Sequence, residues 1–203
     1  MLLLVSGATR TVARYKENPR LGRLVTPANR NSVESLVRGG LPWAADNAAF
    51  SGFDEPRYLR MVGRIAGQPG CLFVTAPDVV GDAGATMSLF RQWRPLLAEK
   101  GLPVAFVAQD GQEKRRTPWD SIEALFIGGT TDWKLGEGAK ALAAEAKARG
   151  KWLHMGRVNT RQRIRLAYAW ACDSIDGSGF SRWPDIRIPK GLRWIEECEP
   201  TRK

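Results

Sequence analysis

The sequence predicts an α/β fold, namely a compact (β/α)8 barrel of the TIM type built as a single domain. Short apolar runs that stop at Gly, Pro, Asn or Asp alternate with amphipathic segments, and this pattern is typical of a parallel sheet covered by helices. Eight such runs occur in 203 residues, a length near the lower end for this barrel. An open doubly wound sheet is the alternative. The chain lacks the G-x-G-x-x-G and Walker A sequences that usually accompany such a sheet.

The predicted strands are short and apolar, and each is followed by a turn-forming residue. They cover residues 2–6, 23–26, 43–46, 72–76, 104–108, 124–127, 152–155 and 173–176. Four amphipathic segments between the later strands have apolar residues at three-to-four spacing and predict helices over 56–66, 83–99, 137–148 and 160–171. The spacer between the fifth and sixth strands has room for only a short helix.

Two parts of the chain depart from this alternation. Residues 6–22 are rich in Arg and turn-forming residues, so they are compatible with a barrel segment or with a mobile arm that contacts a nucleic acid. Near the other end, Pro184 and Pro189 predict an extended path over residues 183–189. A last short helix is then expected over 192–198.

The composition is that of a soluble globular chain with an excess of positive charge. Hydrophobic residues make up 43% of the chain, and its formal net charge is +10. Such a charge raises the local concentration of polyanions, so nucleic acid is the expected partner; a merely soluble basic protein is the alternative. Three scattered cysteines and the single histidine, His154, argue against a disulfide scaffold or a zinc site and indicate a reducing cytoplasmic setting. No apolar run approaches the about 18 residues of a membrane span, so no membrane association is expected.

Polar residues and glycines collect where the predicted strands end. Active sites of TIM barrels lie on this face. Its carboxylates are Asp46, Asp78, Asp110 and Asp176, and they are joined by the amide of Gln109 and by Gly128, Gly129 and Gly156. Turn formation explains each residue taken alone, whereas their succession favours a site. The set is suited to purine recognition, because carboxylates accept from the N–H groups of guanine, amides donate to its O6, and a second carboxylate can attack a sugar carbon.

These segments, in this order, resemble the tRNA-guanine transglycosylases, and especially their small phage and bacterial relatives that place 7-deazaguanines such as preQ0 in DNA. The resemblance covers roughly residues 43–182. Three strands of the family, which carry its Gly-Gly pair, its Leu-Met-Gly sequence and its nucleophilic aspartate, have similar counterparts here. The counterparts are Phe126-Ile127-Gly128-Gly129, Leu153-His154-Met155-Gly156-Arg157-Val158 and Asp173-Ser174-Ile175-Asp176.

The resemblance implies a role for each matching residue. Asp176 resembles the nucleophile that attacks C1′ of the target nucleotide and holds the covalent intermediate, and Asp46 resembles the general acid and base. The residues implied to bind the base are Asp78, Gln109, Gly128, Gly129, Met155 and Gly156, with the N–H of Gly129 on the base carbonyl and Met155 on the flat face of the base. No cofactor or metal is implied, because the covalent intermediate keeps the energy of the displaced glycosidic bond.

Two departures from the family narrow the expected substrate. Asp46 is followed by Asn47-Ala48-Ala49-Phe50-Ser51, where the tRNA enzymes have Ser-Gly-Gly-Phe-Gln, and the zinc subdomain of those enzymes is missing. The expected function is therefore that of a glycosyltransferase that exchanges guanine in DNA for a 7-deazaguanine co-substrate, with or without a partner protein. An RNA-acting enzyme of the same family and a non-catalytic barrel that binds nucleic acid stay open as alternatives.

Basic and aromatic residues near the same face suit a nucleic-acid substrate. The cations expected to contact it are Lys114, Arg115, Arg116, Arg157 and Arg182, and a solvated rim is the alternative reading. Trp133 or Trp183 is a candidate for lining the space left by a flipped guanosine, unless it packs in the core or at the rim. His154 is interpreted as a structural or a catalytic histidine, and Cys172 as an inert buried thiol.

Overall fold

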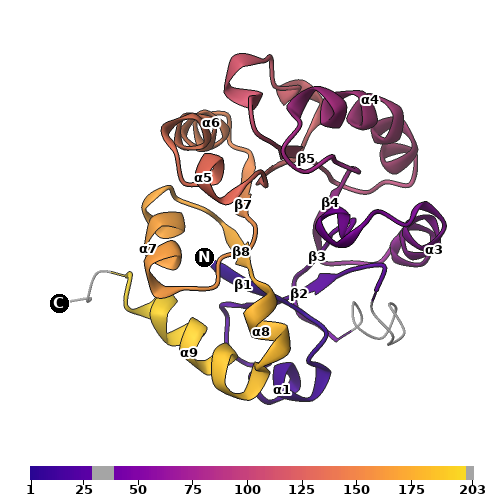
Figure 1. The fold of residues 1–203 in the computed structure, drawn as a ribbon. Helices are drawn as coiled ribbons and strands as arrows, with labels where there is room; N and C mark the ends of the chain where they lie inside the picture. Colours follow the sequence, from indigo (N-terminus) through magenta and orange to yellow (C-terminus); the bar gives the residue numbers. More distant parts are fainter. Residues whose placement is uncertain (29–38, 200–203) are drawn as a thin grey trace.

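Eight parallel strands close into a barrel in the order in which they occur along the chain (Figure 1). The computed structural model describes residues 1–28 and 39–199. The strands are β1 (Leu2–Ser6), β2 (Leu21–Val25), β3 (Trp43–Ala45), β4 (Cys71–Thr75), β5 (Val104–Ala108), β6 (Ala124–Ile127), β7 (Trp152–Met155) and β8 (Ser174–Asp176). Each strand pairs with its neighbours, and β8 pairs with β1. The predicted (β/α)8 barrel is confirmed.

Helices surround the barrel on its outside (Figure 1). They are α1 (Thr9–Arg14), α3 (Glu55–Ile65), α4 (Ala83–Glu99), α5 (Thr131–Lys134), α6 (Glu137–Ala148), α7 (Arg161–Ala169), α8 (Ser178–Arg182) and α9 (Pro184–Glu196). Short 3-10 turns form η1 (Ala49–Ser51), η2 (Gln112–Lys114) and η3 (Trp119–Ser121). The spacer between β5 and β6 therefore holds only short turns, in agreement with its length.

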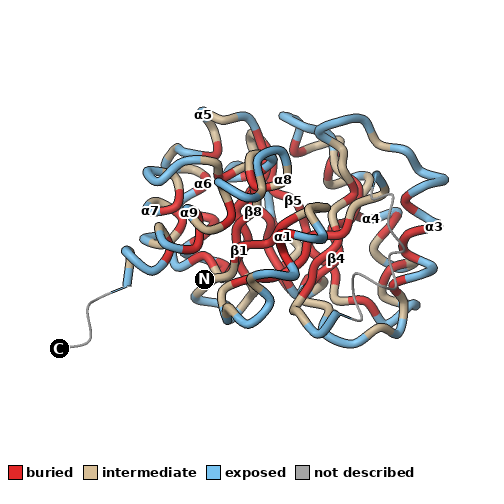
Figure 2. The backbone as a smooth tube through the Cα atoms, turned by 90° about the horizontal axis from the view of Figure 1, so that it is seen from below, coloured by how far each residue is buried: buried red, intermediate tan, exposed pale blue. Residues whose placement is uncertain are grey.

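The strands separate two layers of core, because successive side chains point to opposite faces of the sheet. The larger cluster joins the outer faces of the strands to the helices. The smaller cluster fills the barrel interior with Leu4, Leu24, Ala44, Phe73, Ala105, Val107, Ala124 and Phe126. Figure 2 shows the resulting band of buried backbone through the centre of the molecule. Because these side chains fill the middle of the barrel, a ligand in the barrel would have to bind at its end.

The C-terminal segment differs from its prediction as an extended chain. α9 is one continuous helix that starts at Pro184 and contains Pro189. Pro184 occupies the first turn, where a missing N–H removes no helical hydrogen bond. Ile188, Leu192 and Ile195 lie on one buried face of α9. Burial of this face outweighs the single bond lost at Pro189.

Residues 6–22, for which a mobile arm was one interpretation, contain α1. This helix packs against α9. The hydroxyl of Thr11 donates to the carboxylate of Asp185 at 2.8 Å, and Arg14 forms an ion pair with the same carboxylate at 3.0 Å. The two ends of the chain are thus joined beside the closure of the barrel. Within residues 1–28 and 39–199, no helix has the length and apolarity that crossing a membrane requires.

Candidate active site

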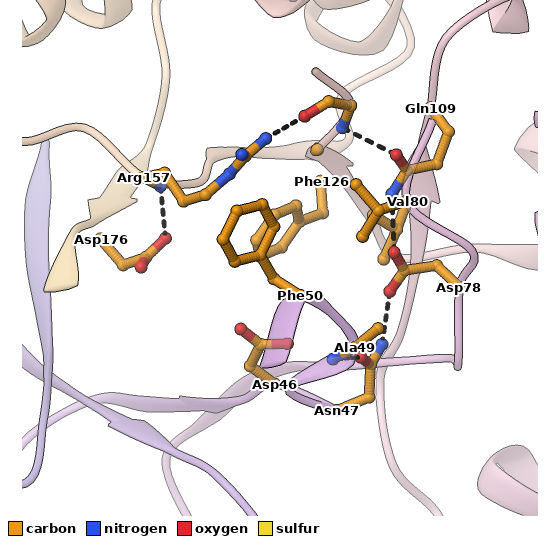
Figure 3. A pocket seen from close by; sticks show the side chains of 13 residues that line it. Asp46, Asn47, Ala49, Phe50, Asp78, Val80, Gln109, Phe126, Arg157 and Asp176 are labelled. Atoms are coloured by element: carbon orange, nitrogen blue, oxygen red, sulfur yellow. Dashed lines mark hydrogen bonds between the residues drawn. The ribbon is translucent and has the colours of Figure 1, made fainter. Parts of the chain in front are cut away.

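A pocket opens at the carboxyl ends of the strands, on the face that the sequence predicts (Figure 3). Three carboxylates line it from different strand ends: Asp46 after β3, Asp78 after β4 and Asp176 at the end of β8. Its other polar lining residues are Asn47, Gln109 and Arg157, and its apolar walls include Phe50, Val80, Val107 and Phe126. The backbone of Gly128 and Gly129 completes the wall after β6.

A chain of hydrogen bonds fixes one side of the pocket (Figure 3). The amide nitrogen of Asn47 donates to Oδ1 of Asp78 at 2.8 Å, and Nε2 of Gln109 donates to Oδ2 of the same carboxylate at 2.6 Å. Oε1 of Gln109 accepts from the N–H of Gly129 at 2.9 Å and from that of Gly81 at 2.9 Å. The result is a rigid edge of alternating acceptors and donors.

Asp176 is held through one of its two carboxylate oxygens. Oδ1 accepts from the backbone N–H of Arg157 at 3.2 Å and lies 3.1 Å from Nε2 of His154. Among the described residues, no hydrogen-bond partner contacts Oδ2. The carboxylate is therefore oriented by Oδ1 and keeps Oδ2 available to a ligand.

Asp46 lies in the turn that leads from β3 to η1, in a different environment from that of Asp176. Its Oδ1 accepts from the N–H of Ala48 at 3.0 Å. Burial, followed by the negative charges of Asp176 and Asp78, raises the pKa of Asp46 to about 7. At neutral pH this carboxyl is thus poised between its acid and base forms.

The pKa of Asp78 is also raised, but by less than that of Asp46. Burial raises its pKa to about 6, while the hydrogen bonds donated by Asn47 and Gln109 and the charge of Arg157 lower it. Because these bonds favour the ionised form, Asp78 is suited to accept hydrogen bonds from a ligand rather than to give up a proton.

Arg157 connects the two sides of the pocket. Its backbone has a positive φ of 59°, which turns its N–H toward Asp176. Its guanidinium donates to the carbonyl of Gly129 and lies over the ring of Phe50, 4.4 Å from the ring centroid. Phe50 is 66% exposed, so it and Arg157 form the rim over the partly buried carboxylates.

Lys134 lies fully buried at the end of α5, behind the pocket. Its Nζ donates to the carbonyl of Gly156 at 2.7 Å. Burial, together with the charge of Arg157, lowers the pKa of Lys134 to about 7, although Asp176 acts in the opposite direction. The lysine ties the loop after β7 to α5.

Most of the predicted site residues come together in the pocket. Those that line it are Asp46, Asp78, Gln109, Gly128, Gly129, Arg157 and Asp176. Gly156 lies just beneath it, where a Cβ atom would come within 2.7 Å of the Phe126 ring. Met155 is not among the lining residues: it is fully buried in the outer cluster, because it alternates with His154 along β7. The expectation that Met155 covers the flat face of a ligand is therefore corrected.

The other predicted cations do not converge on this pocket. Lys114 and Arg115 line a separate hollow beside Asp82 and Asp110. Arg116 lines a groove between α4 and η3. Arg182 is exposed on α8. Of the predicted cations, only Arg157 reaches the pocket.

The two tryptophans considered for the site lie apart from its lining. Nε1 of Trp133 donates to Glu113 at 2.8 Å, and its ring lies so close to Gly129 that a Cβ atom there would meet it at 2.3 Å. Trp133 thus packs at the rim. Trp183 is 63% exposed at the start of α9.

Sequence reasoning missed the residues that shape the pocket. Asn47 donates to Asp78, while Phe50 and Phe126 supply aromatic walls. The position of Asn47 directly after Asp46 was a sequence signal for its place in the pocket. Alternation along β6 puts Phe126 on the face opposite to Ile127, so this alternation was the sequence signal that Phe126 points into the barrel.

Comparison with known proteins identifies relatives by fold only. No protein-family model matches the chain, and no curated protein matches it. Solved structures of mandelate oxidase are similar in fold: a mutant with the C4a-OH-FMN adduct has a TM-score of 0.63, and one with benzaldehyde has 0.64. Each is 14% identical in sequence, and each alignment covers 97% of this chain and 72% of the oxidase chain.

This comparison contradicts the predicted function. The similar structures described above are oxidases, whereas a glycosyltransferase that modifies DNA with a 7-deazaguanine was expected. That prediction is wrong and is not carried further. The resemblance to the transglycosylase family and the DNA partner stay predictions. At 14% identity, the likeness to the oxidases establishes the barrel and not an activity.

Proposed function

We propose that the protein is a small-molecule hydrolase that uses a pair of carboxylates to cleave the bond between a sugar carbon and a planar nitrogen heterocycle. One observation carries the proposal: Asp46 and Asp176 face one pocket in opposite environments. Enzymes that break glycosidic bonds commonly use two carboxyl groups, one for proton transfer and one as the nucleophile.

The ligand class follows from the rigid edge and the aromatic walls. Each oxygen of Asp78 accepts one amide N–H and has a further lone pair for a ligand N–H, while Gln109, which donates to Asp78, also accepts from the N–H of Gly129. Phe126 gives the same space a flat apolar wall. These features favour an uncharged, planar ring that presents N–H groups to Asp78. Three carboxylates disfavour an anionic ligand.

The reaction has two balanced steps. Oδ2 of Asp176 forms a bond to the sugar carbon while the bond from that carbon to the ring nitrogen breaks. The electron pair of the broken bond stays on the ring nitrogen, which takes the proton of Asp46. Water then attacks the same sugar carbon, Asp46 takes the proton of the water, and the ester bond to Asp176 breaks. Asp46 returns to its acid form, and a free sugar and a free heterocycle are released. A pKa of about 7 lets Asp46 serve in both directions.

The residues of the pocket do not fit the flavin named with one of the similar oxidases. A flavin mononucleotide carries a phosphate dianion, and three carboxylates line this pocket. Arg157 is the single cation among the described lining residues, and its guanidinium is already bonded to Gly129 and placed over Phe50. No step of the proposed reaction uses a flavin.

The direct test is release of free base from a panel of adenosine, cytidine, guanosine and uridine, followed by chromatography. We expect wild type to hydrolyse at least one of them. Asp176→Ala and Asp46→Asn should each lower the rate by about 100-fold or more, because nucleophile and acid are lost. Asp132→Asn, an exposed position on α5 outside the pocket, serves as the matched control and should retain the wild-type rate.

Two results would contradict the proposal. One is the absence of base release from every nucleoside in the panel. The other is hydrolysis that Asp176→Ala leaves unchanged, since activity would then come from elsewhere in the protein or from a contaminant.

A further inference from the structure

A buried line of hydrogen bonds leads along the barrel interior to Asp176. Nε1 of Trp152 donates to Oγ of Ser174 at 2.9 Å, Oγ of Ser174 lies 2.8 Å from Nδ1 of His154, and Nε2 of His154 lies 3.1 Å from Oδ1 of Asp176. The four residues come from β7 and β8, where His154 and Ser174 are partners in register. The line of hydrogen bonds ends at the proposed nucleophile, which lines the pocket.

The chemistry of the donors fixes the direction of each bond. An indole N–H can only donate, so Ser174 accepts from Trp152 and has its own hydroxyl proton to give. Among the described residues, the acceptor in contact with that hydroxyl is Nδ1 of His154. An Nδ1 that accepts leaves the proton of a neutral imidazole on Nε2, and Nε2 then donates to Oδ1 of Asp176.

We infer that His154 is a positioning residue: its imidazole, held as the Nε2–H tautomer by Ser174 and Trp152, fixes Oδ1 of Asp176 and turns Oδ2 toward the substrate. The catalytic meaning of this inference rests on the proposed hydrolase function, whereas the tautomer and the contact do not. A carboxylate fixed by one oxygen needs no reorientation before attack, and misplacement of a reacting group by about 1 Å can reduce a rate by about 100-fold.

The surroundings of His154 restrict it to this role. Its side chain is fully buried, so it does not touch a ligand in the pocket. The rings of Phe73 and Phe126 flank the imidazole with centroids at 5.2 and 4.5 Å. The two rings confine the imidazole between them, and its burial keeps it from bulk water.

The inference can be tested without an activity assay, because the chain contains a single histidine. Long-range proton–nitrogen correlation spectra of protein labelled with 15N-histidine at pH 7 report which ring nitrogen carries the proton. We expect a protonated Nε2 and a bare Nδ1, and Ser174→Ala should shift the Nδ1 resonance because its donor is lost. A protonated Nδ1 with a bare Nε2, an imidazolium, or an Nδ1 resonance that Ser174→Ala leaves in place would overturn the inference.

The kinetic arm uses a matched pair of substitutions at His154. His154→Gln keeps an N–H near the position of Nε2, whereas His154→Leu keeps apolar volume and removes the donor. With a nucleoside that wild type hydrolyses, we expect His154→Leu to lower kcat by about 10- to 100-fold with KM nearly unchanged, and His154→Gln to restore most of kcat. Thermal unfolding first establishes that both variants are folded.

The outcomes separate this inference from the proposed function. A folded His154→Leu variant with wild-type kcat, or Gln and Leu variants that lose kcat equally, would refute the positioning role while hydrolysis stands. If no nucleoside is hydrolysed but the Nε2–H tautomer and its response to Ser174→Ala are observed, the proposed function fails and the hydrogen-bonded line to Asp176 is upheld.

Discussion

At the scale of single residues, the site depends on two carboxyl groups of the same type in unlike surroundings. Asp46 is partly enclosed beside two other carboxylates, and these surroundings raise its pKa to about 7. Asp176 instead has hydrogen-bond partners on one oxygen only, and these partners orient its carboxyl group. The surroundings of each carboxyl group therefore favour proton transfer by Asp46 and nucleophilic attack by Asp176, a distinction that residue type alone cannot make.

The raised pKa of Asp46 predicts a pH dependence of folding. The unfolded chain releases this proton near pH 4, whereas the folded protein keeps it until about pH 7, so wild-type stability falls as pH rises through this window. Asp46→Asn lacks this loss. Its free energy of unfolding, compared with wild type, should therefore rise between pH 4 and pH 8 by on the order of 1–2 kcal/mol, allowing for solvent screening. Urea unfolding at both pH values measures the difference; a constant difference would show that Asp46 ionises normally.

The sequence predicted most of the residues that line the pocket, but not the direction in which every side chain points. Asp46, Asp78, Gln109 and Asp176 follow from their places at strand ends. The family resemblance implies Met155 as a ligand contact, whereas alternation along β7 turns His154 inward and Met155 outward.

At the scale of elements, α9 shows how burial overrides a local signal. Two prolines predicted an extended segment, yet three apolar residues at helical spacing form a buried face against the barrel and α1. Propensity is a local term of a few kcal/mol at most, and burial of several large side chains exceeds it. The strands and the four helices predicted between the later strands agreed with prediction, because periodicity and propensity favour the same structure there.

A pair of isoleucines on α9 tests this interpretation. Ile188 is fully buried and Ile186 is 67% exposed on the same helix. Ile188→Ala should lower the free energy of unfolding by about 2–5 kcal/mol through lost burial and a residual cavity. Ile186→Ala should change it by less than about 0.5 kcal/mol. Equal effects in urea unfolding would mean that α9 does not pack as a helix with this face inward.

At the scale of the whole molecule, closure of the barrel brings carboxylates together that are far apart in sequence. Asp46 and Asp176 meet because β1 joins β2 to β8 and the carboxyl ends of parallel strands share one face. This much could be predicted from alternating strands and helices. The placement of the predicted cations could not be predicted, because it depends on the paths of the loops. Arg157 reaches the pocket, while Lys114, Arg115 and Arg116 line other hollows. A net charge of +10 describes the molecule without locating a partner.

In the proposed reaction, Asp46 and Asp176 are an electrostatically coupled pair, with Asp46 as the acid and base and Asp176 as the nucleophile. Carbon-13 NMR titration of the aspartate carboxyls, with Asp46→Asn to assign the signal, measures this coupling. We expect the Asp46 carboxyl to titrate near pH 7 in wild type and at lower pH in Asp176→Asn, because a neighbouring negative charge is removed. A midpoint near pH 4 that Asp176→Asn leaves unchanged would show that the two carboxyls are not coupled.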